Sequence, residues 1–256
     1  NIYVMRDRYK DEQYFSRFIS ESENGLNNLS IKLKNGEVLP ERVNFVKIGM
    51  LQYLNNIILA KYSRGESIEE IKPYLLDAIH LTFESWDGFG LLYHKGKTRL
   101  NQYGLSTYDS MLWMLSLGYL LDIDDVDFKK LVAVIDRDQV KDFLYEFIIR
   151  TKLKDRQPIT EESYEIYYFA PKAYELLRTA IIQYNMADAE KLVAKFVRKD
   201  WYNKHKSAGW YNSHLSNGGY FGYWSFETAA VVIIMGLDDS SFIDCRYYPK
   251  DLVTFS

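Results

Sequence analysis

Apolar residues recur with the spacing of an α-helix in one segment after another, and this repeated pattern constrains the fold most strongly. Between Ile68 and Phe83 they occupy the i, i+3, i+4 and i+7 positions, which predicts a helix of about 18 residues with one buried face. Ser67 and Glu70 have the spacing of a capping box at its start. Similar stripes predict further helices over 43–58, 128–135, 140–148, 173–184, 189–197 and 226–237.

One segment is apolar on nearly every side. Residues 108–121 include six large apolar side chains between Met111 and Leu117, so we expect a central helix surrounded by others. Only residues 29–39, with Asn35-Gly36 between alternating side chains, hint at a β-hairpin. Because two isolated strands are marginally stable, we expect a loop or a frayed helix there. The predicted fold is all-α, with about nine to eleven helices packed as antiparallel hairpins and bundles in two adjoining halves.

A polar stretch near the middle of the chain is the best candidate for a linker. Residues 151–160 are rich in Lys, Asp and Arg and contain Pro158, whereas helical stripes continue on both sides. We therefore expect an N-terminal helical domain over 1–150 and a C-terminal helical domain over 151–256. The sequence shows no fixed-period repeat.

Charge and cysteine content limit the classes of function and compartment. The formal net charge of -3 and the pI near 5.9 argue against direct nucleic-acid binding, which usually requires a basic excess. The single cysteine, Cys245, cannot form an internal disulfide and fits a reducing compartment. No signal-peptide core and no run of eighteen apolar residues occurs, so we expect a cytoplasmic protein without membrane contact.

The residues of common catalytic and metal sites are not grouped in this chain. Glycine-rich phosphate-binding loops are absent, and four histidines with one cysteine form no metal-ligand pattern. We therefore predict no catalytic residue, no metal and no cofactor. One enzyme alternative stays open: Asp87 and Glu227 could act as acid and base in a cleft of aromatic residues, as in glycosidases built from helices. The competing interpretation is that these rings fill gaps between short helices.

Two groups of acidic residues are candidates for partner binding. Each has a structural alternative, because Asp124 or Asp125 is a natural N-cap and acids in a first turn suit the helix dipole. Clustered acids also attract a basic partner and accelerate association. The first group is Asp122, Asp124, Asp125 and Asp127, and the second is Glu161, Glu162 and Glu165.

Aromatic motifs in the C-terminal third resemble a known family. They comprise 220–230 with the string GYWSFE, Gly236–Ser240, and 247–252 with the string YYPKDL, preceded by Trp201-Tyr202 and Trp210-Tyr211. This succession resembles the immunity proteins paired with polymorphic nuclease effectors, which are toxins delivered by type VI and related secretion systems. The resemblance covers about residues 170–253, and the N-terminal half resembles the family's other domain more loosely.

The resemblance implies a non-enzymatic, all-helical inhibitor that binds a cognate DNase, a basic protein, and protects the producing cell. A helical scaffold for another protein and, less favoured, a carbohydrate-active hydrolase remain as alternatives. The oligomeric state stays open. We expect the motif residues to serve the fold mainly, as rings at a tight corner and as helix caps. They are Tyr220, Gly222, Tyr223, Trp224, Glu227, Asp238, Asp239, Tyr248, Pro249 and Asp251.

Overall fold

The structure is a computed structural model that describes residues 3–159 and 171–255. It is 63% helical with one small two-stranded sheet, so the predicted all-α class with nine to eleven helices is confirmed for the residues described. The chain divides into two compact units. Unit 1 comprises Asn1–Trp86 and Asn212–Tyr223, and unit 2 comprises Asp87–Tyr211 and Trp224–Ser256. The prediction of two domains that meet at residue 150 stays a prediction.

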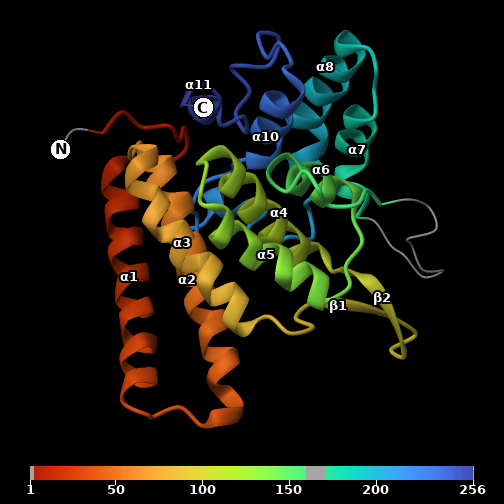
Figure 1. Cartoon of the computed structure of the whole chain (residues 1–256). Coiled ribbons are helices and arrows are strands. Elements are labelled where there is room, and N and C mark those ends of the chain that lie inside the picture. Colours follow the sequence, from red (N-terminus) through yellow and green to blue (C-terminus); the bar gives the residue numbers. More distant parts are fainter. Residues whose placement is uncertain (1–2, 160–170, 256) are drawn as a thin grey trace. The chain divides into compact units, whose positions relative to one another are not determined.

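Unit 1 is built on three long helices that run beside one another (Figure 1). They are α1 (Glu12–Lys34), α2 (Val43–Arg64) and α3 (Ile68–Ser85), and α2 packs against both others. The predicted capping box begins α3, since the Ser67 hydroxyl accepts from the Glu70 N–H and the Glu70 carboxylate accepts from the Ser67 N–H. A short 3-10 turn, Pro40–Arg42, precedes α2. A local sequence signal therefore places the start of α3.

Glycines shape unit 1 at two close approaches. Gly65 ends α2 with a φ of +105°, and a Cβ there would lie 2.0 Å from the carbonyl oxygen of Val4. Gly25 lies inside α1, where a Cβ would lie 2.4 Å from the ring of Tyr53. The segment 29–39 begins as the last turns of α1, which continues to Lys34 before the loop.

Unit 2 is arranged around α4 (Leu105–Leu120), the helix predicted to be central. Its residues 111–118 are all buried, and it packs against α10 (Phe226–Met235), α6 (Phe143–Lys152) and α5 (Asp125–Arg137). Because its apolar side chains point in all directions, neighbours on several sides are required to cover them.

Shorter elements complete unit 2. The helices α7 (Glu175–Ile181) and α8 (Met186–Lys195) pack on each other across a short turn. A 3-10 turn, η3 (Lys172–Tyr174), precedes α7. A single π-helical turn, η4 (Phe196–Asp200), and α9 (Trp201–Asn203) continue from α8, and α11 (Lys250–Phe255) follows Pro249. In unit 1, η5 (Ser213–Leu215) is a further 3-10 turn.

The one sheet of the described residues is a β-hairpin that the sequence patterns did not predict. Strand β1 (Leu91–His94) pairs antiparallel with β2 (Thr98–Tyr103), and the register shifts between Leu91 and Tyr93. Lys95, Gly96 and Lys97 connect them. Lys95 and Gly96 have positive φ (51° and 69°), as in a type I′ turn, and the Lys97 N–H donates to the His94 carbonyl at 3.1 Å. None of the described helices is both long and apolar enough to cross a lipid bilayer.

Candidate functional site

The first acidic group lies on the surface of unit 2, where α4 turns into α5. We call Asp122, Asp124, Asp125 and Asp127 the acidic knuckle. Ile123 and Phe128 are buried, and a Cβ on Gly118 would meet both of their side chains at 3.1–3.2 Å, so the turn packs closely on α4. This packing leaves the aspartates outside the core.

The knuckle is exposed and only partly neutralised by lysines. The Asp122 and Asp125 side chains are 97% and 61% exposed, and both lie near the Lys152 ammonium, at 3.4 and 3.5 Å. Asp127 pairs with Lys130 at 3.0 Å. Exposed pairs of this kind contribute little stability, about 0–1 kcal/mol each, so a partner could replace them readily.

The knuckle also has structural uses. Asp124 is the N-cap residue of α5 but makes no side-chain cap bond, and Asp125 and Asp127 stand in the first helical turn, where the dipole favours acids. Asp122 has a φ of +46°, a conformation that aspartate tolerates better than most residues. That the knuckle contacts a partner stays a prediction. The second group, Glu161, Glu162 and Glu165, lies outside the described residues.

The first part of the aromatic motif belongs to unit 1, where it packs against the start of the chain. The Tyr14 hydroxyl donates to the Tyr220 carbonyl (2.7 Å) and accepts from the Tyr220 N–H (2.9 Å). The Tyr220 hydroxyl donates to Asp7, and the Ser63 hydroxyl donates to the Phe221 carbonyl at 2.9 Å. Burial, with the nearby charge of Asp7, raises the pKa of Tyr220, which keeps this phenol protonated.

Two further motif residues complete this corner. Gly222 is buried with a φ of +110°, a conformation that glycine adopts without strain. The Tyr223 ring stacks edge-on against Tyr220 at 4.9 Å, and its hydroxyl accepts from the His214 N–H at 3.0 Å. All these groups are turned inward within unit 1, which supports the structural interpretation.

The rest of the motif lies in unit 2 and makes internal bonds there. Glu227 is buried at the start of α10 and accepts from the Ser225 hydroxyl at 2.7 Å. Asp238 accepts from the Ser240 N–H at 3.0 Å, and this bond lowers the pKa of Asp238. The buried Tyr248 donates to Asp239 at 2.7 Å. Trp224 and Pro249 are also buried, and Asp251 stands in the first turn of α11.

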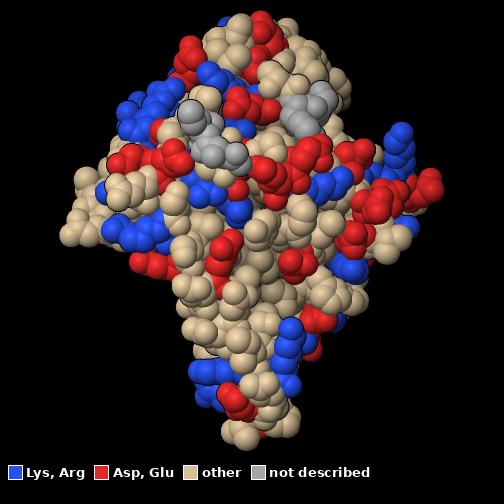
Figure 2. Space-filling view, turned by 90° about the vertical axis from the view of Figure 1, so that its left-hand side faces the viewer, with Lys and Arg blue, Asp and Glu red and all other residues tan. Residues whose placement is uncertain are grey.

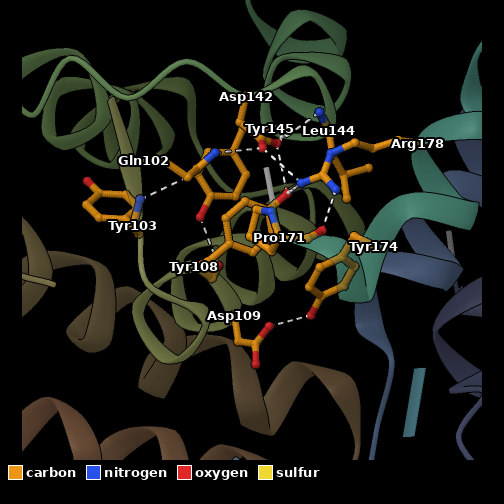
Figure 3. A network of polar contacts seen from close by, with 10 residues as sticks. All are labelled: Gln102, Tyr103, Tyr108, Asp109, Asp142, Leu144, Tyr145, Pro171, Tyr174 and Arg178. Atoms are coloured by element: carbon orange, nitrogen blue, oxygen red, sulfur yellow. Dashed lines mark hydrogen bonds and ion pairs between the residues drawn. The ribbon is translucent and has the colours of Figure 1, made fainter. Parts of the chain in front are cut away.

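A buried polar network that the sequence patterns missed holds α4, α6 and α7 together (Figure 3). Asp142 caps α6 by accepting from the N–H groups of Leu144 and Tyr145 at 3.0 Å. The same carboxylate accepts from the Tyr108 hydroxyl at 2.9 Å and pairs with Arg178 at 3.1 Å. The sequence pattern predicts a helix over 140–148, whereas α6 begins at Phe143 because Asp142 serves as its N-cap.

A second buried group has the residue types of an acid–base site. Asp109 accepts from the Tyr174 hydroxyl at 2.6 Å and lies 3.0 Å from Nε2 of His205, whose ring is fully buried. Burial opposes charge on His205, but the Asp109 carboxylate and the Trp201 carbonyl outweigh it and raise the pKa of His205. Burial also raises the pKa of Glu227 to about 7, and the charge of Asp109 adds to this effect.

His205 and Glu227 are buried, and the Asp109 carboxylate, 20% exposed, is occupied by Tyr174 and His205. Glu227 is 3% exposed, whereas Asp87 is an exposed loop residue, so Glu227 cannot serve as the second carboxylate of an open glycosidase cleft. A groove of about 540 Å³ lies in unit 1 between α1, α2 and residues 217–219. Glu21 supplies the one carboxylate of its lining, so this groove lacks an acid–base pair as well.

Apolar surface is concentrated at the end of the α1–α2 hairpin. Ile31, Leu39 and Phe45 are 53%, 60% and 67% exposed there. Figure 2 shows this end of unit 1 at the bottom, where uncharged surface lies between basic and acidic side chains, and charges of both signs are also interspersed over the face above. In unit 2, Tyr184 is fully exposed between Ile182 and Met186. Exposed aromatic and aliphatic side chains of this kind are common anchors in protein interfaces.

Comparisons with known proteins match the whole length of the chain. A family model described as "PoNe immunity protein (PoNi), N-terminal" matches residues 5–133, and one described as "PoNe immunity proteins (PoNi), C-terminal" matches residues 140–252. A search of curated proteins found no match. The fold is similar to that of protein PA2201 from Pseudomonas aeruginosa in its crystal structure, with a TM-score of 0.68 and 16% identity. That alignment covers 100% of this chain and 91% of the other.

Proposed function

The chain belongs to the family of PoNe immunity proteins, a family of non-enzymatic inhibitors that confer immunity to nuclease toxins, and from this we propose that it binds and neutralises a cognate bacterial DNase. The observation that carries the proposal is that the two family models together span residues 5–252. Inhibition by binding needs no catalytic group. His205 and Glu227 are buried, and the partly exposed Asp109 is bonded to Tyr174 and His205, which agrees with a role in binding.

The exposed features of unit 2 support a charged protein partner. A DNase needs basic residues to hold phosphates, and the aspartates of the knuckle could occupy the same basic surface. An interface of standard size covers about 800 Å² on each partner and usually has a few aromatic or aliphatic anchors. We further propose that the complex forms in the cytoplasm of the producing cell, where the DNA to be protected lies, and that the toxin is of the type VI secreted kind.

Co-expression with the nuclease encoded beside this gene tests the proposal. We expect the two proteins to co-purify and the purified chain to stop DNA cleavage in proportion to its concentration. Association should slow as salt rises, because steering by complementary charges is screened. The proposal fails if the neighbouring nuclease cleaves DNA unimpeded in a saturating excess of this chain.

A further inference from the structure

The β1–β2 hairpin carries positive charge only, in a chain whose net charge is negative. Residues 88–104 contain Lys95, Lys97, Arg99 and His94 but no aspartate or glutamate, whereas the whole chain has 35 acids and 32 Lys or Arg. Residues 93–98 are all exposed, and the Tyr93 side chain is 52% exposed. Figure 1 shows the turn of the hairpin pointing away from α4, α5 and α6 of the same unit. The result is a narrow, exposed basic turn beside the exposed ring of Tyr93.

A buried carboxylate fixes the base of this hairpin. Asp138, 1% exposed at the end of α5, accepts from the Gly88 N–H at 2.8 Å and from the Tyr103 hydroxyl at 2.5 Å. The Arg99 guanidinium donates to the Asp138 carbonyl, and the Lys141 N–H donates to the Asn101 carbonyl at 3.1 Å. An isolated two-stranded hairpin is marginal in water, so these bonds hold it in place. A binding element held this way loses little entropy on association.

The charge of the hairpin selects the part of a nuclease that it fits. The DNA-binding surface of a nuclease is basic and would repel the lysines. Its catalytic centre differs, because nucleases commonly hold divalent metal ions on carboxylates in a concave site. Lysine ammonium groups on a narrow turn can enter such a site and offset the charge of those carboxylates. Resting on the proposed function, we propose that the Lys95–Lys97 turn inserts into the carboxylate-lined metal site of the toxin.

The knuckle and the hairpin then act on different surfaces of the same partner. They stand at opposite ends of α5, a helix of 13 residues that is about 20 Å long. One standard interface is wide enough to include both. The acids would meet the basic DNA-binding surface, and the lysines would meet the catalytic carboxylates. Nucleic acid is the less favoured ligand of the hairpin, because three cationic side chains neutralise only about three phosphates and give weak binding.

The test reverses the charge of the turn and leaves the fold alone. We expect Lys95→Glu/Lys97→Glu to weaken inhibition of the nuclease about 10- to 100-fold, with unchanged circular dichroism and melting temperature. Lys191→Glu/Lys195→Glu is the matched control, since these two lysines are exposed on α8 and the change in net charge is the same. We expect this control to inhibit like the wild type. Equal inhibition by the turn variant and the control overturns the hairpin proposal but leaves the proposed function intact.

A second measurement identifies the surface on the toxin. A nuclease whose metal-binding aspartates are changed to asparagine should bind the wild-type chain and the turn variant with nearly equal affinity, because the ammonium groups lose their partners. Mg²⁺ should compete with the wild-type chain more strongly than NaCl of equal ionic strength. If the asparagine nuclease still binds the wild-type chain much more tightly than the turn variant, the assignment to the metal site is overturned. Binding of DNA alone by the wild-type chain, lost in the turn variant, overturns it in favour of nucleic acid. If the wild-type chain does not bind the nuclease at all, the proposed function itself fails.

Discussion

Single polar side chains join segments of this chain that lie far apart in the sequence. The Tyr14 hydroxyl bonds both the N–H and the carbonyl of Tyr220, 206 residues away. This one hydroxyl therefore satisfies both backbone hydrogen-bonding groups of Tyr220, as a neighbouring strand does in a sheet. Because both backbone groups are buried, losing this partner leaves two polar groups without a hydrogen bond.

Replacing Tyr14 by phenylalanine should therefore destabilise unit 1. We expect a loss of about 1–3 kcal/mol in the free energy of unfolding, measured by urea denaturation. Tyr184→Phe is the matched control. Because the Tyr184 side chain is fully exposed, this variant should have the stability of the wild type. Equal midpoints for the two variants would show that the Tyr14 hydroxyl contributes nothing.

Glu227 makes stability depend on pH. Its pKa is about 7 in the folded chain against an ordinary value of 4.5, so the folded state retains a proton that the unfolded state releases. The contribution is fully present below pH 4.5 and is lost as pH rises to about 7. Glu227→Gln should be more stable than wild type above pH 7 by about 1–3 kcal/mol, and nearly equal to it at pH 4.5.

Thermal unfolding of both proteins at pH 4.5, 6 and 8 measures this effect. Burial lowers the pKa of His205, but Asp109 and in part the charge of Glu227 raise it overall, so its contribution is also lost above pH 6.5. Because Glu227→Gln removes part of that effect, the measured difference reports both groups. A difference in stability that stays constant across the three values would mean that Glu227 is ionised throughout.

At the residue scale, contacts between near neighbours were predictable and distant ones were not. The bonds between Ser67 and Glu70 follow from a spacing of three residues, and the structure contains them. Nothing in the local pattern connects Tyr14 with Tyr220, or Asp142 with Arg178, because folding alone brings these residues together. The sequence predicts only part of the environment of Glu227. Its position at a helix start is predicted, whereas its burial near the charge of Asp109 is not.

At the scale of elements, hydrophobic periodicity predicted the helices that bury a continuous stripe. Both α3 and α4 agree with their patterns. The hairpin was missed because its strands are short and their register is irregular, so alternation is weak. What holds it is Asp138, which lies 35 residues beyond Tyr103.

The acidic knuckle is an element whose role can be tested by neutralisation. Changing Asp122, Asp124, Asp125 and Asp127 to asparagine should slow association with the nuclease about tenfold and flatten its dependence on salt. Asparagine tolerates the positive φ of Asp122 and the N-cap position of Asp124, so the fold should be kept. Stopped-flow association rates at several NaCl concentrations measure the effect.

A matched control removes the same charge elsewhere. Glu12, Glu41, Glu69 and Asp77 are exposed acids of unit 1, and their amide variants change the net charge by the same amount. If both quadruple variants associate equally slowly, net charge matters and the knuckle is no contact site. If neither is slowed, the knuckle plays no part in steering.

At the scale of the whole molecule, unit 1 is assembled from two separate stretches of sequence. Residues 212–223 lie far along the chain, yet they belong with Asn1–Trp86. They bury Tyr220 and Tyr223 and bond to Tyr14, Asp7 and Ser63. The polar run 212–219, rich in Asn, Ser and Gly, indicates a loop, but nothing in it indicates that the chain returns to unit 1. The family could be inferred from the motif strings, because these are short patterns within one stretch of sequence. The path of the chain between the two units could not be inferred from them.

Fragments test the dependence of unit 1 on this distant stretch. A fragment of residues 1–86 should be less stable by about 3–6 kcal/mol than the same fragment joined by a flexible linker to residues 210–225. Calorimetry and circular dichroism compare the two. A fragment 1–150 that melts as cooperatively as the linked form would contradict the expectation, and would favour the predicted domain boundary at residue 150.

The late return of residues 212–223 also sets the timing of folding during synthesis. The ribosome must add the roughly 125 residues of 87–211 before the stretch that completes unit 1 emerges, which takes about 6–25 s at ordinary rates of elongation. During that interval the aromatic face of α1 around Tyr14 and Phe15 lacks its cover. A cell that translates toxin and inhibitor together therefore gains from starting the inhibitor first, and nascent chains of this protein should be clients of ribosome-associated chaperones.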